Sequence, residues 1–170
     1  HPNQGKWSAL NRAILSLDAD VAICIDADTQ VTPDAVSKMV EHFQNPRVGA
    51  VAGKIVVGNL VNTLTRMQAL EYVTAQNFER RAFDRMNGIL VVPGAIGAWR
   101  VSALRDAGLF CQDTMTEDCD LTISVNRVGY RVVYDERAVA YTEAPQTIRA
   151  FLTQRLRWSL GMFQSAWKHK

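Results

Sequence analysis

Two aspartates, Asp26 and Asp28, directly follow the apolar run of residues 21–25. A run that is apolar on both faces is typical of a β-strand covered by helices on each side. In open α/β sheets, ligands bind beyond the carboxyl ends of the strands, so these two carboxylates stand where a site would lie. Carboxylate oxygens suit Mg²⁺ or Mn²⁺, which usually reach a protein through one or two carboxylates and the phosphates of a substrate. The pair therefore indicates a substrate that carries phosphate.

The aspartate pair could also form a turn or a calcium-binding loop, and Gly5-Lys6 could belong to a phosphate loop. An Asp after a strand often only forms a turn or caps a helix, and this alternative stays open. A calcium-binding loop would need Gly at its sixth position and Glu at its twelfth, where the sequence has Val31 and Ser37. A nucleotide-binding phosphate loop would need Ser or Thr after Gly-Lys, but Trp7 follows that dipeptide. Both kinds of loop are excluded.

A second acidic group, residues 116–120, opens a predicted helix. Acids are favourable at a helix N-terminus, and Thr114 with Glu117 fits the capping-box pattern, which accounts for Glu117 and Asp120. Asp118 stands three residues before the first apolar residue of the helix, so we expect it on the inward side of the first turn. A carboxylate held there could accept a proton from a substrate hydroxyl.

A third group, Gln154, Arg157 and Trp158, has the spacing that places three side chains on one face of a helix. Arg offers a two-pronged hydrogen-bond donor to phosphate, Trp offers a flat surface for a sugar, and Gln can both donate and accept. The alternative is a basic amphipathic helix whose aromatic residues pack against the protein or lie at a membrane interface. Both interpretations can hold together.

The rest of the sequence predicts the elements that must hold these groups. The alternation of helix and strand implies an α/β fold with a mainly parallel sheet flanked by helices and a C-terminal amphipathic helix. The small-residue loop Gly94–Ala98 permits either a tight bend or the close approach of a ligand. Helices are expected over residues 7–17, from Thr32-Pro33 onward, and over 62–85, 102–107 and 147–167, with further strands over 48–57, 89–92, 131–134 and 138–141.

Composition limits the class of protein. A chain of 170 residues with 48% hydrophobic content can bury one sizeable core and gives no reason to expect two domains. A formal net charge of +2 is too small to imply a nucleic-acid partner. The three cysteines form no CxxC pair, which argues for reduced thiols and a cytosolic environment, and no apolar run approaches the ~18 residues of a membrane span. The C-terminal end is basic, because no Asp or Glu follows Glu143 while five cations do: Arg149, Arg155, Arg157, Lys168 and Lys170.

Four short motifs, in their order along the chain, resemble the processive members of glycosyltransferase family 2, namely cellulose, chitin and hyaluronan synthases and bacterial poly-N-acetylglucosamine synthases. Each motif is weak alone, but four in this order, covering nearly the whole chain, are highly specific. They are Gly5-Lys6, Asp26-x-Asp28, Thr116-Glu117-Asp118 and Gln154-x-x-Arg157-Trp158. The resemblance implies a GT-A fold and an inverting transfer from a UDP-sugar, expected to be UDP-N-acetylglucosamine, to the end of a growing β-linked polysaccharide.

The resemblance also implies roles for individual residues. Asp28, helped by Asp26, would hold a divalent metal, Mg²⁺ or Mn²⁺, on the diphosphate, and Asp118 would be the general base. The other implied substrate-binding residues are Lys6 near the nucleotide, Gly94 and Ala95 near the acceptor sugar, Gln154, Arg157 and Trp158 at the diphosphate and acceptor end, and Glu117.

Relatives of this kind begin with a strand and an acidic loop that grip the uracil, and they continue into transmembrane helices. We therefore expect residues 1–170 to be a single GT-A domain that lacks the N-terminal part of the nucleotide-binding half. Its parent would be an integral membrane protein with this core on the cytosolic face of the plasma membrane. Two other functions stay open: a non-processive family 2 transferase that adds one sugar to a lipid or other acceptor, and a non-catalytic module that binds the membrane surface.

Overall fold

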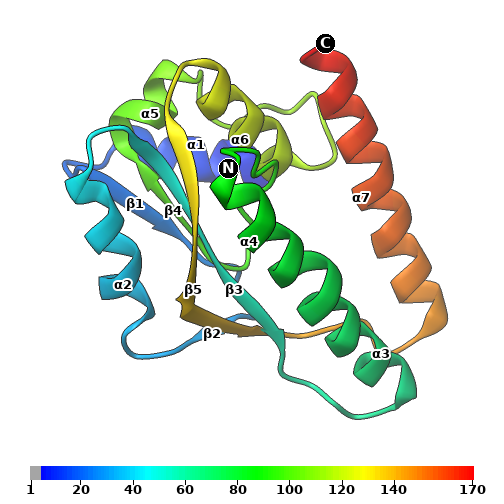
Figure 1. Ribbon diagram of the computed structural model, residues 1–170. Coiled ribbons are helices and arrows are strands. Elements are labelled where there is room, and N and C mark those ends of the chain that lie inside the picture. The colour runs from blue at the N-terminus through cyan, green and yellow to red at the C-terminus, as the bar shows by residue number, and fades with distance from the viewer. Residues whose placement is uncertain (1–4) are drawn as a thin grey trace.

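Helices flank one curved five-stranded sheet in this computed structural model, which describes residues 5–170 (Figure 1). The strands are β1 (Val21–Cys24), β2 (Gln30–Val31), β3 (Val48–Val57), β4 (Gly97–Arg100) and β5 (Arg131–Thr142). The α-helices are α1 (Lys6–Leu15), α2 (Ala35–Glu41), α3 (Thr63–Glu71), α4 (Phe78–Arg85), α5 (Val101–Asp106), α6 (Glu117–Arg127) and α7 (Ile148–Lys168). A 3₁₀ turn (His42–Gln44) follows α2, and a π-helical stretch (Tyr72–Asn77) joins α3 to α4.

The strand order is β1-β4-β3-β5-β2, and it corrects the expectation of a mainly parallel sheet. Only β3 and β5 pair in parallel. The strand β4 runs antiparallel to both of its neighbours, β1 and β3, and β2 runs antiparallel to β5. The sheet is therefore mixed, because the chain enters β4 from the opposite end to the one that a regular βαβ repeat would use.

The expected strand over residues 89–92 does not form, and the hydrogen bonds of its backbone explain why. The Val92 amide donates to the hydroxyl of Thr122 at 2.9 Å, and the Ile89 carbonyl accepts from the side-chain amide of Asn126 at 3.1 Å. Side chains of α6 thus satisfy backbone groups that a sheet ladder would otherwise have to satisfy. The segment passes beneath α6, and Pro93, which has no amide hydrogen to donate, precedes the turn into β4.

Two further expectations change in detail. The strands expected over 131–134 and 138–141 are one strand, β5, whose pairing with β3 shifts register between Gly53 and Lys54. The helix expected to begin at Thr32-Pro33 starts at Ala35 instead, because Thr32 is held to β5 by its backbone amide and its hydroxyl, both of which donate to the carbonyl of Val139.

The start of α6 also differs from the capping box expected between Thr114 and Glu117. The N-cap residue is Thr116, whose side chain makes no capping hydrogen bond. The long helical pattern over 62–85 and the helix over 147–167 are both confirmed, the first with Asn62 and the second with Thr147 as a side-chain cap.

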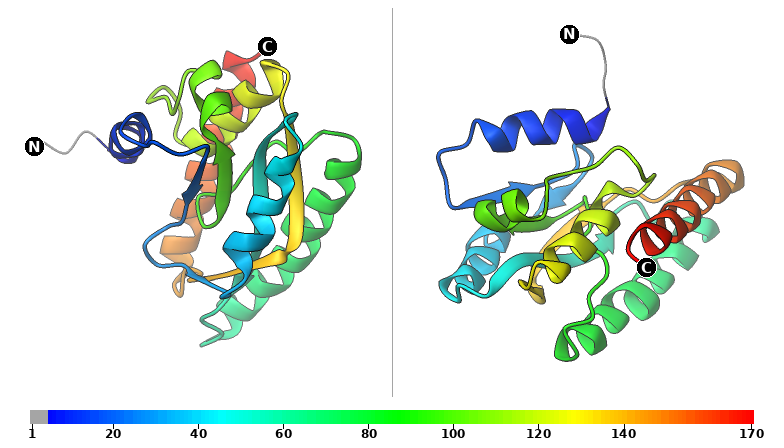
Figure 2. Two further views of the ribbon diagram at one scale, coloured as in Figure 1. Left: turned by 90° about the vertical axis from the view of Figure 1, so that its left-hand side faces the viewer. Right: turned by 90° about the horizontal axis from the view of Figure 1, so that it is seen from above.

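The core lies on both faces of the sheet because the residues of β3 alternate between them. Ala50 and Ala52 pack with Leu104 of α5 and Leu121 of α6 on one face, whereas Val51 packs with α2 on the other. The left view of Figure 2 shows α2 in front of the sheet, with α1 beyond its β1 edge and α4 beyond β5 at the other edge. Small alanines in the central strand let the helices approach the sheet closely, which brings the starts of α1 and α6 to the end of β1.

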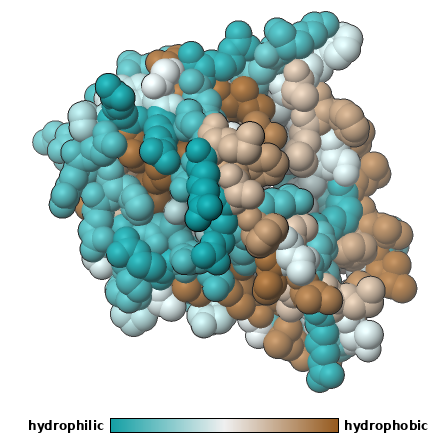
Figure 3. All heavy atoms as spheres, in the orientation of Figure 1, coloured by the Kyte–Doolittle hydropathy of each residue, from teal (hydrophilic) through white to brown (hydrophobic). Residues whose placement is uncertain are grey.

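The final helix, α7, contributes little apolar surface to the core. Its buried residues are Gly161 and Ser165, while Phe163 is 75% exposed. Apolar residues gather over α3 and α7, whereas the side over α2 is mostly hydrophilic (Figure 3). The amphipathic character expected of α7 stays a prediction. Among residues 5–170, none of the helices combines the length and the apolar content that crossing a bilayer requires.

Candidate active site

The two aspartates of the first motif lie just beyond the end of β1, and α1 delivers a cation to them. The Lys6 ammonium is 2.7 Å from Asp26 Oδ1 and 3.4 Å from Glu117 Oε1. Burial alone would lower the pKa of Lys6, but the hydrogen bonds and charges of the two acids outweigh it and raise the pKa above its usual value. Lys6 therefore stays charged and bridges Asp26, which follows β1, and Glu117 of α6. Asp28 is exposed.

Gly94 approaches this ion pair so closely that a side chain would not fit without displacing it. A Cβ atom at Gly94 would lie 2.8 Å from Lys6 Nζ and 3.1 Å from Asp26 Oδ2. Its backbone amide donates to the carboxylate of Asp118. The tight bend expected of this loop is confirmed, because the Ile96 amide donates to the Pro93 carbonyl at 3.2 Å, and β4 begins directly after it at Gly97. The close approach of a ligand to Gly94 stays a prediction.

Asp118 occupies the first turn of α6 with a half-buried carboxylate. Its Oδ1 accepts a hydrogen bond from the Cys119 amide at 2.9 Å. Burial, and secondarily the charge of Glu117, raise the pKa of Asp118, and the hydrogen bonds and the cation of Lys6 only partly oppose this. A carboxylate with a raised pKa beside a cavity is suited to accepting a proton.

The helix α7 places the third motif across from these acids. The carbonyl oxygen of the Gln154 side chain is buried and has no hydrogen-bond partner within residues 5–170. Trp158 is half-buried and packs at the edge of the core, and Arg157 is exposed. All ten residues singled out in the sequence line one cavity of about 590 Å³: Lys6, Asp26, Asp28, Gly94, Ala95, Glu117, Asp118, Gln154, Arg157 and Trp158.

Sequence reasoning missed Arg155, which lies between the third motif and the wall of the cavity formed by α3. Its guanidinium is 2.8 Å from Glu71 Oε2 and 4.6 Å from the centroid of the Trp158 ring. The cation fixes the indole from one side. The sequence indicated Arg155 only as one of the basic residues of the C-terminal end, and the contact with Glu71, 84 residues away in the chain, reveals its position.

Arg80 of α4 also lines the cavity, and no motif indicated it. Its Nη1 atom is buried without a hydrogen-bond partner among the described residues. Burial lowers the pKa of Arg80, while the charges of Tyr134 and Asp118 act in the opposite direction. The preceding π-helical stretch is a feature that is frequent at functional sites, but it cannot be read from sequence.

A second hollow of about 640 Å³ lies away from these residues and is lined by groups such as His42, Asp135 and Arg137. Asp135 is 2.7 Å from the Arg137 guanidinium and 2.8 Å from His42 Nε2. Although burial opposes it, these partners lower the pKa of Asp135 to about 2. Asp135, His42 and Arg137 are thus already paired with one another in the described part of the chain.

Solved structures with the same arrangement of elements define the class. A mannosyltransferase from Pyrobaculum calidifontis, solved with GDP-mannose and Mn²⁺, superposes with a TM-score of 0.74 at 21% identity, covering 97% of this chain and 43% of that one. Glucosyl-3-phosphoglycerate synthase from Mycobacterium tuberculosis, solved with Mn²⁺ and UDP-glucose, gives 0.60 at 16% identity, covering 95% and 55%. The fold is that of the GT-A glycosyltransferases.

Sequence comparison narrows this class to a family. The model of glycosyl transferase family group 2 matches residues 21–170, so the chain belongs to that family. Poly-beta-1,6-N-acetyl-D-glucosamine synthase of Staphylococcus epidermidis is 32% identical over 160 residues, covering 94% of this chain and 39% of that protein. The Staphylococcus aureus enzyme of the same name gives the same values. The chain spans about two fifths of the length of these relatives. The match to the family model confirms the resemblance to glycosyltransferase family 2.

Proposed function

We propose that this chain is the catalytic core of an inverting, metal-dependent glycosyltransferase. It would move N-acetylglucosamine from a UDP donor to the end of a growing β-linked polysaccharide. The observation that carries the proposal is the single cavity in which Asp118, the acids after β1 and the third motif of α7 meet. The relatives named above, poly-N-acetylglucosamine synthases, support the choice of sugar.

The donor set of this cavity fits a hard divalent cation such as Mg²⁺ or Mn²⁺. Asp26 and Asp28 both line it and offer only oxygen ligands. Within the described part of the chain, no group of three or more His, Cys, Asp or Glu side chains could hold a metal, so substrate phosphates would complete the coordination. Asp28 is the freer ligand, because Lys6 engages Asp26. When bound, such an ion neutralises charge on the departing diphosphate.

The chain's own residues supply the remaining chemistry. Asp118 takes the proton of the attacking acceptor hydroxyl, and Arg157 donates hydrogen bonds to the diphosphate as its negative charge grows. Lys6 holds Glu117 and Asp26 in place, and the bare backbone of Gly94 leaves room for the reacting sugar. The unpartnered oxygen of Gln154 accepts a hydroxyl or amide hydrogen of the sugar.

Membrane attachment of the intact protein belongs to the same proposal. The helix α7 has basic residues and no acids, and several of its apolar side chains are exposed, Leu152 by 59% and Leu156 by 62%. Such a helix suits the anionic cytosolic surface of a membrane. We propose that residues 1–170 form one domain there, beside the channel through which the polymer would leave.

The proposed function is tested by product analysis of the intact protein in membranes, supplied separately with UDP-glucose and UDP-N-acetylglucosamine. Long chains from UDP-N-acetylglucosamine alone would support the proposal. Single-addition products would favour the non-processive transferase instead, and the absence of metal-dependent UDP binding would favour the membrane-surface module.

Replacing Asp28 by Ala is expected to remove metal-dependent binding of UDP. The diphosphate and the carboxylate must share one ion, and Asp28 is the acid without a strong partner in the protein, with only a 3.5 Å contact from the Thr29 hydroxyl. Isothermal calorimetry of the intact protein with UDP, with and without Mn²⁺, measures the effect.

Asp18→Ala is the matched control for this experiment, because Asp18 is exposed and does not line the cavity. It should bind UDP as the unmodified protein does. If Asp28→Ala bound UDP in the presence of Mn²⁺ with unchanged affinity, the assignment of Asp28 as a metal ligand would be wrong.

Replacing Arg80 by Met is expected to shift the acid limb of the pH–rate profile toward higher pH. Activity requires the ionised form of Asp118, so the rate rises as the pH passes upward through its pKa, which burial already raises. The positive charge of Arg80 favours that ionised form, and its removal raises the pKa further. Measuring kcat/KM against pH reveals the shift, with activity recovered at high pH.

Arg81→Met is the control, because Arg81 is the neighbouring arginine, is paired with Glu136 at 3.0 Å and does not line this cavity. Its profile should match that of the unmodified protein. A profile of Arg80→Met that is lower at every pH but not displaced would show that Arg80 does not act on Asp118 by charge.

A further inference from the structure

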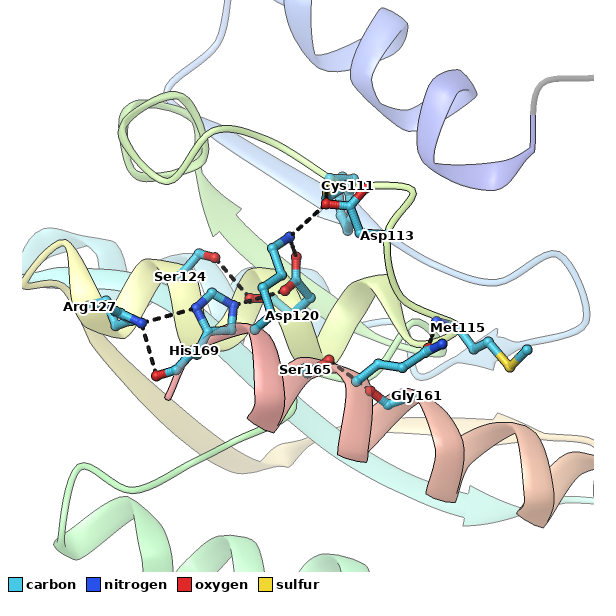
Figure 4. A network of polar contacts seen from close by, with 12 residues as sticks. Cys111, Asp113, Met115, Asp120, Ser124, Arg127, Gly161, Ser165 and His169 are labelled. Atoms are coloured by element: carbon cyan, nitrogen blue, oxygen red, sulfur yellow. Dashed lines mark hydrogen bonds and ion pairs between the residues drawn. The ribbon is translucent and has the colours of Figure 1, made fainter.

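Asp120 is a buried carboxylate two residues after Asp118, and its side chain is only 3% exposed. Both of its oxygens bind the C-terminal end of α7: Oδ2 is 3.0 Å from Lys168 Nζ, and Oδ1 is 2.8 Å from His169 Nε2 (Figure 4). A capping role therefore does not fully account for Asp120, since its side chain bonds another helix rather than the start of its own. Burying a carboxylate is costly unless it is paired, which makes this contact specific.

His169 is held between Asp120 and Arg127. A carboxylate only accepts hydrogen bonds, so His169 Nε2 donates to Asp120. Arg127 only donates, and its Nη1 lies 3.4 Å from His169 Nδ1 and 3.0 Å from the His169 carbonyl oxygen. Lys168 also lies 3.4 Å from Asp113, so a second acid joins the contacts at this end of α7.

The contacts along α7 show what this end of the helix controls. Gly161 packs directly against Thr116, because a Cβ atom there would lie 2.8 Å from the Thr116 backbone nitrogen. The next turn is held by Gln164, whose Oε1 accepts from the Met115 amide at 2.9 Å. The part of α7 that precedes Gly161 in the sequence carries Gln154 and Trp158, which line the cavity.

The helix thus resembles a lever whose pivot is the contact of Gly161 with Thr116. Gln154 lies seven residues from Gly161, about 10 Å along a helix that rises ~1.5 Å per residue. A tilt of about 6° would move it by ~1 Å, and a displacement of that size can cost about 10²-fold in rate. The end of the lever opposite the cavity is the one that Asp120 holds.

We infer that Asp120, with Lys168 and His169, forms a latch that sets the position of α7 and hence of Gln154, Arg157 and Trp158 relative to Asp118. Asp120 is in this view a positioning residue of the transfer reaction, and the inference rests on the function proposed above. The helix α6 would then carry both the general base, Asp118, and the residue that holds α7 in place, Asp120.

The test compares His169→Leu with His169→Gln in the intact protein, because the Gln side chain keeps an N–H donor for Asp120. We expect kcat per folded molecule to fall about 10–100-fold in the Leu variant and to recover to within about threefold in the Gln variant. Asp120→Asn should resemble the Leu variant. Lys170→Gln, which changes the next residue and leaves the latch intact, should have no effect.

Two further measurements separate positioning from simple stabilisation. Metal-dependent UDP binding should persist in the Leu variant, because Asp28 is not on α7, but it should be weaker, because Arg157 is displaced with that helix. If the Leu variant binds UDP and turns over like the unmodified protein, the latch serves stability alone and the inference is overturned.

Hydrogen exchange of the α7 amides gives an answer that does not depend on activity. We expect faster exchange over residues 154–169 in the Leu variant and not in the Gln variant. If the α7 amides of the Leu variant exchanged at the same rate as in the unmodified protein, the latch would be overturned, and this result would not depend on which reaction the protein catalyses. An unmodified protein that fails to transfer sugar while its latch variants still loosen α7 would instead overturn the proposed function.

Discussion

Asp118→Asn is expected to lower turnover by roughly 10²–10⁴-fold, the usual loss for a general base, while leaving UDP binding nearly intact. The amide oxygen of Asn can still accept the hydrogen bonds that the Cys119 and Gly94 amides donate to Asp118, so the start of α6 should keep its shape. What the amide cannot do is take a proton from the acceptor hydroxyl. Steady-state rates with UDP-N-acetylglucosamine, together with UDP calorimetry, measure both quantities.

Glu117→Gln is the matched comparison, because Glu117 is the adjacent acid and lines the same cavity. Its carboxylate faces Lys6 at 3.4 Å, so we expect its loss to weaken the grip on the nucleotide more than the chemical step. If Glu117→Gln bound UDP and failed to turn over while Asp118→Asn stayed active, the assignment of the base would be wrong.

Trp158→Ala is expected to abolish elongation of the polymer, with donor binding retained. The indole lines the cavity and is fixed by the guanidinium of Arg155, which Glu71 in turn holds at 2.8 Å. A flat, rigid surface of this kind suits the apolar face of a sugar ring at the end of the chain. Product lengths resolved by gel after incubation with labelled UDP-N-acetylglucosamine measure the effect, which we expect to exceed about 10²-fold.

Two variants control this experiment. Trp167→Ala removes an indole from the same helix that is 72% exposed and lies outside the cavity, so chain lengths should not change. Trp158→Phe keeps a flat ring and should restore part of the elongation. If Trp158→Ala made polymer of normal length, Trp158 would not be the residue that holds the end of the growing chain.

The helices and the central strand were largely predictable, because their patterns are local. The apolar run over residues 48–57 is β3, and the periodicity over 62–85 and 147–167 corresponds to the helices found there. Residue type and spacing also predicted which side chains converge on the cavity. Acids that follow a strand or open a helix, and polar side chains that share one face of a helix, have few possible positions in an α/β fold.

Tertiary structure decided what depends on partners distant in the chain. The loss of a strand over residues 89–92 follows from hydrogen bonds to Thr122 and Asn126, which no local pattern encodes. The direction of β4 likewise shows only in its antiparallel pairing with β1 and β3. The roles of Arg80 and Asp120 depend in the same way on packing between helices. Asp120 looks like an ordinary acid at a helix start until α7 brings Lys168 and His169 to it across 48 and 49 residues of sequence. Short-range spacing thus determined which groups could do chemistry, and long-range contacts determined how they are held, because burial and pairing exist only after the helices pack.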